Sequence, residues 1–375
     1  KPLPTATHRY PYHLCLSPIT MLTFTFLLLP VARARASIRA TASHRPAAMF
    51  TAGAAACRRL PRKTLVTALS RSSRRRMRAF GSGSASAVEG YVPPKVWENK
   101  ERPGVWGKLN QPYAGAREER GVPRGEHALQ LYSFATPNGM KAGIFLEELY
   151  DRYKTEYDAW PIKISEGDQF TSGFVEVNPN SKIPALLHYT EENEEPVRVF
   201  ESGSVLLYLA DTLDTDQVFI LKDPKLRAEC ISWLFWQVGA APYLGGGGFK
   251  NFFNAEVKIE SAIDKYALEV KRQFDVLDRH LGGKDGDATG GGPYILGEQF
   301  TIADIAIWTW YGLRALDAKS ADGEFLGLAS YPSVTAWAQR VADRPAVQRG
   351  QRVNKVWGNE AQQLPERHSA ADFES

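Results

Sequence analysis

Residues 129–149 read LQLYSFATPNGMKAGIFLEEL and contain the first strand, turn and helix that the sequence predicts. Residues 129–134 alternate in the manner of a strand with one buried face. Thr-Pro-Asn-Gly at 136–139 is typical of a turn that leads into a helix, and the apolar residues after it recur at helical spacing. The stretch therefore predicts a strand that ends at a turn and continues as a helix.

Short strands and helices continue beyond this stretch. Further strands are predicted over residues 160–164, 184–188 and 197–200. The acidic segment 191–195 is too polar for anything but the turn between the last two strands. Residues 202–211 then predict a helix with one apolar face. This order of elements fits a small sheet covered by helices, of thioredoxin type, so we predict an α/β domain over residues 127–215.

The sequence that follows shows no strand pattern. Residues 226–244 are apolar on all sides, which predicts a buried helix. Apolar residues within 259–281 step by three and four, which predicts a long amphipathic helix. Thr301 and Asp304 have the spacing of an N-terminal capping box with a structural role. These features predict an all-helical domain over residues 224–350.

The first 88 residues differ in composition from the rest. No Asp or Glu occurs before Glu89, whereas residues 1–88 hold 15 Lys and Arg. Met49–Arg78 looks like an amphipathic organelle presequence, and the apolar run Leu22–Val31 is too short to span a bilayer as a helix. We therefore expect a targeting leader that is removed in a mitochondrion or plastid. If the leader is not translated, we expect a cytoplasmic protein.

Residues 89–375 are acidic overall, because they hold 31 of the 46 basic residues and all 42 acidic ones. A Pro-rich, polar segment over residues 89–126 predicts an extended arm before the first domain, and residues 351–375 form a charged tail. A body of this charge lacks the basic face that nucleic-acid binding requires. It also contains no apolar run long enough to span a membrane.

Cys230 is the only cysteine within residues 89–375. One thiol can form neither an intramolecular disulfide nor a structural zinc site, so we expect no metal. The residue lies in the apolar helical run 229–236, which favours a core position over a role as nucleophile.

Three short segments, each at the end of a strand or the start of a helix, together predict a site for a small peptide with charged ends. They are Thr136-Pro137-Asn138-Gly139, Asn180-Ser181-Lys182-Ile183-Pro184 and Phe200-Glu201-Ser202-Gly203. Free amides and the helix dipole at Ser202 attract an anion, and Glu201 beside them can pair with an ammonium group. A zwitterionic amino-acid head group fits this pair.

The other two segments complete the predicted site. A cis bond before Pro184 exposes the backbone of Ile183 to an extended ligand, and Lys182 can reach a terminal carboxylate. A thiolate near Thr136 and Asn138 meets amide donors and the positive end of a helix, which lower the pKa of a thiol. No cysteine stands there, so the thiolate must belong to the ligand. Taken alone, each segment is equally a plain turn or helix cap.

Other motifs are incomplete. Gly245–Gly248 lacks the spacing and the Ser or Thr of a phosphate loop. Asp285-Gly286-Asp287 lacks an acidic residue at Leu296, where a calcium loop needs one. Phe200 and Ser204 stand where a hydrolase nucleophile elbow around Ser202 needs glycine.

In combination, the motifs resemble those of the glutathione transferase superfamily, and most closely its nu class. The shared motifs are TPNG at 136–139, GDQF at 167–170, SKIP at 181–184, FESGSVLLYLA at 200–210, WLFW at 233–236 and IAD at 302–304. The resemblance covers about residues 91–375. It implies a thioredoxin-like domain followed by an all-α domain, in a homodimer. It also implies that each subunit binds two glutathione molecules or one glutathione disulfide.

The resemblance also implies roles for single residues. Thr136 and Asn138 would face the glutathione sulfur as the catalytic pair. The first tripeptide would be held by Gln169, Lys182, Ile183, Glu201 and Ser202, and the second would touch Asn110 in the arm. Lys265 stands where we expect arginine in close relatives. Lysine keeps the charge but loses the forked hydrogen-bonding geometry, which weakens a second site.

The implied activity is that of a glutathione-dependent disulfide-bond oxidoreductase. A bound glutathione thiolate attacks a small or mixed disulfide, and a second glutathione resolves the product. Two alternatives stay open on the sequence: a transferase that conjugates glutathione to electrophiles, and a non-catalytic glutathione-binding regulatory protein. The sequence does not identify the substrate.

Overall fold

A computed structural model describes residues 92–100, 109–190, 195–284, 286 and 289–374. The predicted leader, and residues 191–194 of the predicted acidic turn, lie outside the described residues.

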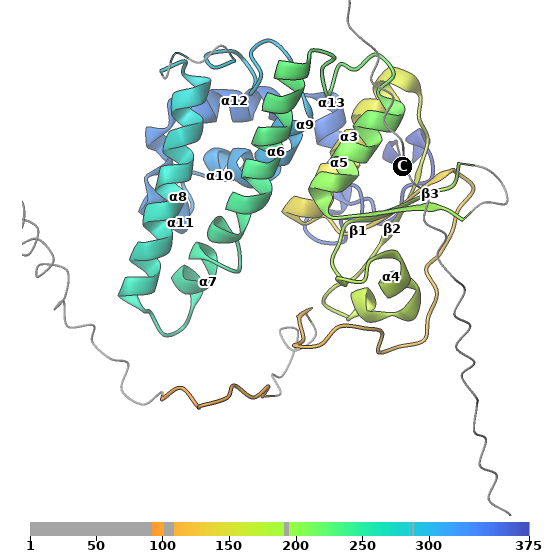
Figure 1. The fold of residues 1–375 in the computed structure, drawn as a ribbon, viewed down its shortest axis with the longest axis horizontal. Helices are drawn as coiled ribbons and strands as arrows, with labels where there is room; N and C mark the ends of the chain where they lie inside the picture. The colour runs from red at the N-terminus through yellow and green to blue at the C-terminus, as the bar shows by residue number, and fades with distance from the viewer. Residues whose placement is uncertain (1–91, 101–108, 191–194, 285, 287–288, 375) are drawn as a thin grey trace, which may run out of the picture. The chain divides into compact units, whose positions relative to one another are not determined.

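Four strands form one sheet (Figure 1). They are β1 (Leu129–Ser133), β2 (Asp158–Pro161), β3 (Ala185–His188) and β4 (Val197–Phe200). Their order is β2-β1-β3-β4, with β1 and β2 parallel and the other two pairs antiparallel. This confirms the predicted thioredoxin-like fold. The second strand begins and ends earlier than predicted, because Pro161 pairs with Ser133, where β1 ends.

The two faces of the sheet are covered by different helices (Figure 1). The helices α3 (Pro137–Tyr153) and α5 (Ser202–Leu213) lie on one face, and α4 (Ser172–Val177) lies on the other. Leu131 of β1 belongs to the large core with α3 and α5, whereas its neighbour Tyr132 belongs to a smaller core with α4. Successive side chains of a strand point to opposite faces, so β1 contributes to both cores.

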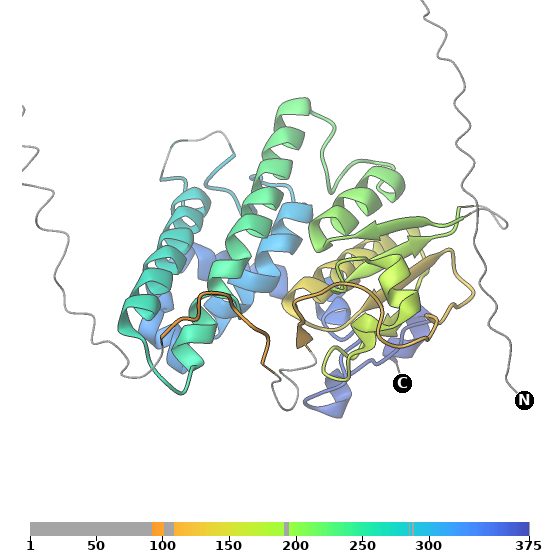
Figure 2. The same cartoon turned by 60° about the horizontal axis from the view of Figure 1, so that its bottom comes forward.

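Among the described residues, helices follow β4 and no further strand does, as predicted, although single residues form isolated bridges. They are α6 (Pro224–Leu244), α7 (Phe249–Asn254), α8 (Glu260–Leu281), α9 (Ile302–Ile307), α10 (Leu313–Leu316), α11 (Ala321–Leu326), α12 (Pro332–Ala342) and α13 (Pro345–Gly350). Short 3₁₀ turns are η1 (Asp168–Phe170), η3 (Leu328–Ser330), η4 (Glu360–Gln362) and η5 (Ala370–Phe373), and η2 (Trp308–Gly312) is a π-helical turn. In both views α6 lies between α5 and α8 (Figures 1 and 2). No helix of the described chain is both long and apolar enough to cross a membrane.

The prediction that the helix over residues 226–244 is buried on all sides is wrong. Cys230 and Leu234 are buried, but Phe235, Val238 and Tyr243 of the same helix are 65%, 40% and 42% exposed. The sequence pattern is apolar all round, yet the chain provides neighbouring helices on one side only.

The capping box at the start of α9 is present as predicted. The Asp304 carboxylate accepts hydrogen bonds from the Thr301 backbone N–H at 2.9 Å and from the indole of Trp337 at 2.9 Å. Burial raises the pKa of the Asp304 carboxyl to about 6, and these hydrogen bonds oppose that rise. The motif therefore fastens α9 to α12 and has a structural role.

The arm passes along α4. The N–H groups of Ser172 and Gly173 donate to the carbonyls of Glu118 and Arg120 at 2.8 and 3.0 Å. A Cβ atom on Gly173 would lie 2.6 Å from the Val122 nitrogen, so only glycine allows this close approach.

The C-terminal segment is an integral part of the fold and is more than the charged tail that the sequence suggests. Arg367 exchanges two backbone hydrogen bonds with Ala159 of the edge strand β2, at 2.8 and 3.2 Å. Its side chain is fully buried and pairs with Glu147 of α3 at 3.4 Å and with Glu156 at 2.5 Å. The segment thus covers one edge of the sheet and neutralises buried charge on α3.

We predict that Arg367→Met lowers the free energy of unfolding by about 3 kcal/mol, because removing one partner leaves the Glu147 charge buried with less compensation. Chemical denaturation would measure the loss. The matched control is Arg272→Met, which breaks an exposed pair with Glu269 and costs about 0.5 kcal/mol. Equal losses in the two variants would contradict a stabilising role for the buried arginine.

Candidate functional site

A cavity of about 280 Å³ opens at the start of α3 and brings most of the predicted site together. Its walls come from the arm, the start of α3, the segment around η1 and the loop before β3. The lining residues are Leu109, Asn110, Thr136, Asn138, Ile164, Gln169, Ser181, Lys182 and Ile183. Six of them are predicted site residues. Glu201, Ser202 and Lys265 are predicted but are not among them.

Thr136 is the N-cap of α3. Its backbone is extended, and its hydroxyl oxygen accepts a hydrogen bond from the Gly139 N–H at 3.3 Å. The hydroxyl hydrogen stays available as a donor to a ligand. Gly139 is required at this turn, since a Cβ atom there would lie 1.9 Å from the Phe134 carbonyl oxygen. The Thr-Pro-Asn-Gly segment therefore sets where the helix begins and how the Thr136 side chain is oriented.

Asn138 is held by a residue that the sequence analysis missed. The indole N–H of Trp310, in the π-helical turn η2, donates to the Asn138 side-chain oxygen at 2.9 Å. No local motif marks Trp310, because the two residues come together only through the packing of η2 against α3.

The loop before β3 forms the opposite wall of the cavity. The Ile183–Pro184 bond is cis, as the sequence analysis expects. The side chain of buried Asn178 donates to the Lys182 carbonyl at 2.6 Å and thereby holds the loop in place. The Lys182 ammonium lies 3.5 Å from the Asn110 side-chain oxygen, so the loop meets the arm across the cavity mouth.

Glu201 and Ser202 lie beside the cavity at the start of α5. Glu201 has a positive φ of 70°, is exposed, and accepts a hydrogen bond from the Asn180 side chain at 3.2 Å. Ser202 is nearly buried, and its hydroxyl oxygen accepts from the Lys141 ammonium at 3.1 Å. The two residues thus connect to the loop and to α3, respectively.

Lys141 is a second residue that the sequence analysis missed. Its side chain is 1% exposed, although it carries an ionisable group. Besides Ser202, the ammonium donates to Gln237 of α6 at 2.6 Å. Burial lowers the pKa of the Lys141 ammonium to about 7, while the nearby Glu201 charge acts in the opposite direction. A buried lysine without a carboxylate partner among the described residues marks this region as a functional candidate.

Lys265 lies on the exposed side of α8, and its ammonium is 5.7 Å from the centre of the Tyr266 ring. It does not line the cavity, so its role stays a prediction. Cys230 does not line it either. Burial raises the pKa of the Cys230 thiol to about 11, which disfavours the reactive thiolate. Nowhere in the described chain do three or more His, Cys, Asp or Glu side chains gather as a metal site.

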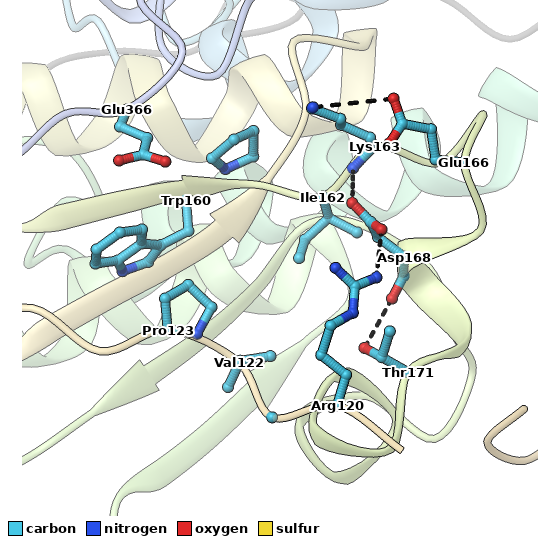
Figure 3. A pocket seen from close by; sticks show the side chains of 12 residues that line it. Arg120, Val122, Pro123, Trp160, Ile162, Lys163, Glu166, Asp168, Thr171 and Glu366 are labelled. Atoms are coloured by element: carbon cyan, nitrogen blue, oxygen red, sulfur yellow. Dashed lines mark hydrogen bonds and ion pairs between the residues drawn. The ribbon is translucent and has the colours of Figure 1, made fainter. Parts of the chain in front are cut away.

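A second cavity of about 270 Å³ is lined by residues of the arm, of the end of β2 and of η1 (Figure 3). Its charged lining is largely paired internally: Arg120 pairs with Asp168 at 2.6 Å, and Lys163 pairs with Glu166 at 3.9 Å. None of the predicted site residues lines it. The neighbours Asp168 and Gln169 line different cavities, Asp168 this one and Gln169 the first.

Comparisons with known proteins agree on one family. The family described as "Glutathione S-transferase, C-terminal domain" matches residues 260–340. "Disulfide-bond oxidoreductase YghU" of Escherichia coli is 49% identical over 289 residues, which cover 76% of this chain and 96% of that protein. "Disulfide-bond oxidoreductase YfcG" of the same organism is 36% identical over 220 residues, which cover 58% of this chain and 92% of that protein.

Solved structures agree with the sequence relatives. A glutathione transferase YghU from Streptococcus pneumoniae, complexed with glutathione, has a TM-score of 0.64 and 47% identity, and the match covers 71% of this chain and 99% of that one. A glutathione transferase from Pseudomonas putida, with one glutathione disulfide bound per subunit, has a TM-score of 0.53 and 34% identity. That match covers 61% of this chain and 93% of the other.

We predict that stability rises with pH because of Lys141. Its pKa is about 7 when folded and near 10.4 when unfolded, so between these values the unfolded state binds more protons. The free energy of unfolding should therefore rise by up to about 1.4 kcal/mol per pH unit from pH 7 upward. Denaturation at several pH values would show this rise in the natural chain and its absence in Lys141→Met.

Lys225→Met is the matched control, because it removes an exposed lysine of α6 and should keep the rise. If the stability of Lys141→Met depends on pH in the same way as that of this control, the claim that folding lowers the pKa of Lys141 is wrong.

Proposed function

The chain belongs to the glutathione S-transferase family, and we propose that it is a glutathione-dependent disulfide-bond oxidoreductase. Two relatives of this chain carry the name disulfide-bond oxidoreductase. The observation that carries the proposal is the cavity at the start of α3, where Thr136 and Asn138 supply polar groups and none of the described lining residues is a cysteine. A thiolate at this position therefore belongs to a bound thiol.

The proposed pose gives each charged group of glutathione a partner. The sulfur lies against Thr136 and Asn138, and one terminal carboxylate lies at Ser202. The buried ammonium of Lys141 behind Ser202 supports an anion there, because it donates to the Ser202 oxygen and leaves the hydroxyl hydrogen for the ligand.

The remaining contacts follow from the same pose. Glu201 accepts the ammonium of the ligand, and Lys182 pairs with its other carboxylate. Ile183 and Gln169 border the peptide. We propose that a second glutathione lies at Asn110, which is supported by the position of Asn110 on the cavity wall and by structures of relatives with two glutathiones or one glutathione disulfide per subunit.

The reaction consists of two thiol–disulfide exchanges. The bound thiolate attacks one sulfur of a small disulfide, a new sulfur–sulfur bond forms, and the other sulfur leaves as a thiolate that takes a proton from water. A second glutathione thiolate then attacks the glutathione sulfur of the mixed disulfide and releases the second substrate thiol. Two glutathiones are oxidised to glutathione disulfide, and one substrate disulfide is reduced.

Nu-class membership, the homodimer and the organellar location are further parts of this proposal. Exposed Phe235 and Val238 on α6 support the homodimer, because a second copy would cover apolar surface that this chain leaves open to solvent. The acid-free composition of residues 1–88 supports the removed leader.

Conjugation of glutathione to an electrophile is the second candidate, because relatives of known structure are named glutathione transferases and the same thiolate can attack carbon. Turnover of a small disulfide and of an aryl halide, each with glutathione, separates the two. The proposal expects faster turnover of the disulfide, and a clear preference for the aryl halide would reverse the assignment.

We predict that Asn138→Ala lowers the reductase rate by about 10- to 100-fold, because a hydrogen bond to a charged sulfur contributes about 1.5–3 kcal/mol. Thr136→Ala should have a similar or smaller effect. Glutathione disulfide has no thiolate, so its affinity should change much less in both variants. Glu201→Ala should instead weaken the binding of glutathione and glutathione disulfide alike. Initial rates and calorimetric titration measure both quantities.

Cys230→Ala is the control for the source of the thiol and should keep the rate within a few-fold, since this cysteine is buried outside the cavity. Loss of turnover in a folded Cys230→Ala protein, or an unchanged rate in Asn138→Ala, would refute the ligand-thiolate mechanism.

A further inference from the structure

Trp310 makes a long-range contact with the proposed reaction centre. Its indole N–H donates to the side-chain oxygen of Asn138 at 2.9 Å, although the two residues lie 172 positions apart. Trp310 belongs to the helical part of the chain, whereas Asn138 lies in the first turn of α3.

The chemistry of the two groups fixes the orientation of the amide. An indole nitrogen can only donate, so the group that faces it must be the oxygen of the Asn138 carboxamide. The amide NH₂ therefore points away from Trp310, and Asn138 also lines the cavity. Without this contact, the carboxamide could turn and present its oxygen to the sulfur, which would repel a thiolate.

We propose that Trp310 is a positioning residue that turns the Asn138 amide hydrogens toward the sulfur of bound glutathione. The inference rests on the proposed function, because it assigns a cause to the orientation of a group that would touch the thiolate. It adds a residue of the helical part to the apparatus that stabilises the reactive sulfur.

The π-helical turn η2 holds Trp310 through its neighbours. Trp308 is 1% exposed and donates to the Ala338 carbonyl at 2.8 Å, and the Tyr311 hydroxyl donates to Gln273 at 2.8 Å. Both neighbours are thereby fastened to other helices. The turn between them directs Trp310 to α3, in keeping with the frequent use of π-helical turns at functional sites.

Gly245 makes room for the ring of Trp310. A Cβ atom at this position would lie 2.7 and 2.8 Å from two carbons of the six-membered ring. The backbone of Gly245 has a φ of −78°, which any residue can adopt, so the requirement for glycine comes from space and not from conformation. This accounts for one glycine of the run Gly245–Gly248, which fits no phosphate-binding motif.

The first test replaces Trp310 by phenylalanine, which keeps an aromatic ring and removes the N–H donor. We expect the reductase rate of Trp310→Phe to fall by about tenfold. The pKa of the bound glutathione thiol, followed by thiolate absorbance in the ultraviolet, should rise, whereas the affinity for glutathione disulfide should hardly change. Trp160→Phe is the matched control, because it also loses a 2.9 Å indole–amide bond, to Gln130, but lies at the other cavity.

A double variant distinguishes positioning from a merely structural role. If Trp310 acts through Asn138, Trp310→Phe should have no further effect on the rate when Asn138 is already alanine. An equal, additive loss in that background would overturn the inference.

A second pair of variants tests the same contact from the other side. Gly245→Ala should displace the ring and reproduce the loss of rate and the rise in thiol pKa. Gly246→Ala should not, because a Cβ atom there would meet no atom within 4 Å.

The outcomes separate this inference from the proposed function. If Trp310→Phe and Gly245→Ala keep the natural rate and thiol pKa while Asn138→Ala loses activity, the positioning role is wrong and the proposed function stands. If Asn138→Ala also keeps the natural rate, both are wrong.

Discussion

Helix α3 carries two carboxylates, Glu147 and Glu148, that are almost completely buried, and each pairs with arginine from another part of the chain. Glu147 accepts from Arg349 at 2.7 Å and also pairs with Arg367, and Glu148 accepts from Arg344 at 2.6 and 2.7 Å. A buried charge is tolerated only when such partners are in place. The helix is therefore held by α13 and the C-terminal segment together, and its position depends on the completed fold.

The candidate site depends on this constraint, because its centre is the first turn of the same helix. Thr136 and Asn138 can aim at a ligand only if α3 is fixed in direction. Lys141, one turn further along, connects the helix to Ser202 of α5 and to Gln237 of α6. The two ends of α3 thus have different roles. The first turn carries residues of the candidate site, and the ion pairs near the C-terminal end hold the helix in place.

Much of the arrangement could be predicted because the signals are local. Alternation predicted β1, the Thr-Pro-Asn-Gly turn predicted that a helix follows it, and the capping box predicted the start of α9. Six predicted site residues line one cavity for the same reason, since each stands at a strand end or a helix start. The burial of the helix over residues 226–244 was predicted wrongly, because an apolar pattern cannot reveal on which side a neighbour will lie.

Local patterns in the sequence were enough to predict the succession of strands and helices of a thioredoxin-like domain and the helix start at which the cavity opens. Which buried groups surround that cavity depends on tertiary packing. Trp310 reaches Asn138 across 172 residues, and Arg367 reaches Glu147 across a still longer separation. Such contacts leave no periodic signal, because hydrogen bonds and ion pairs depend on distances in space, which packing sets, and not on spacing along the chain.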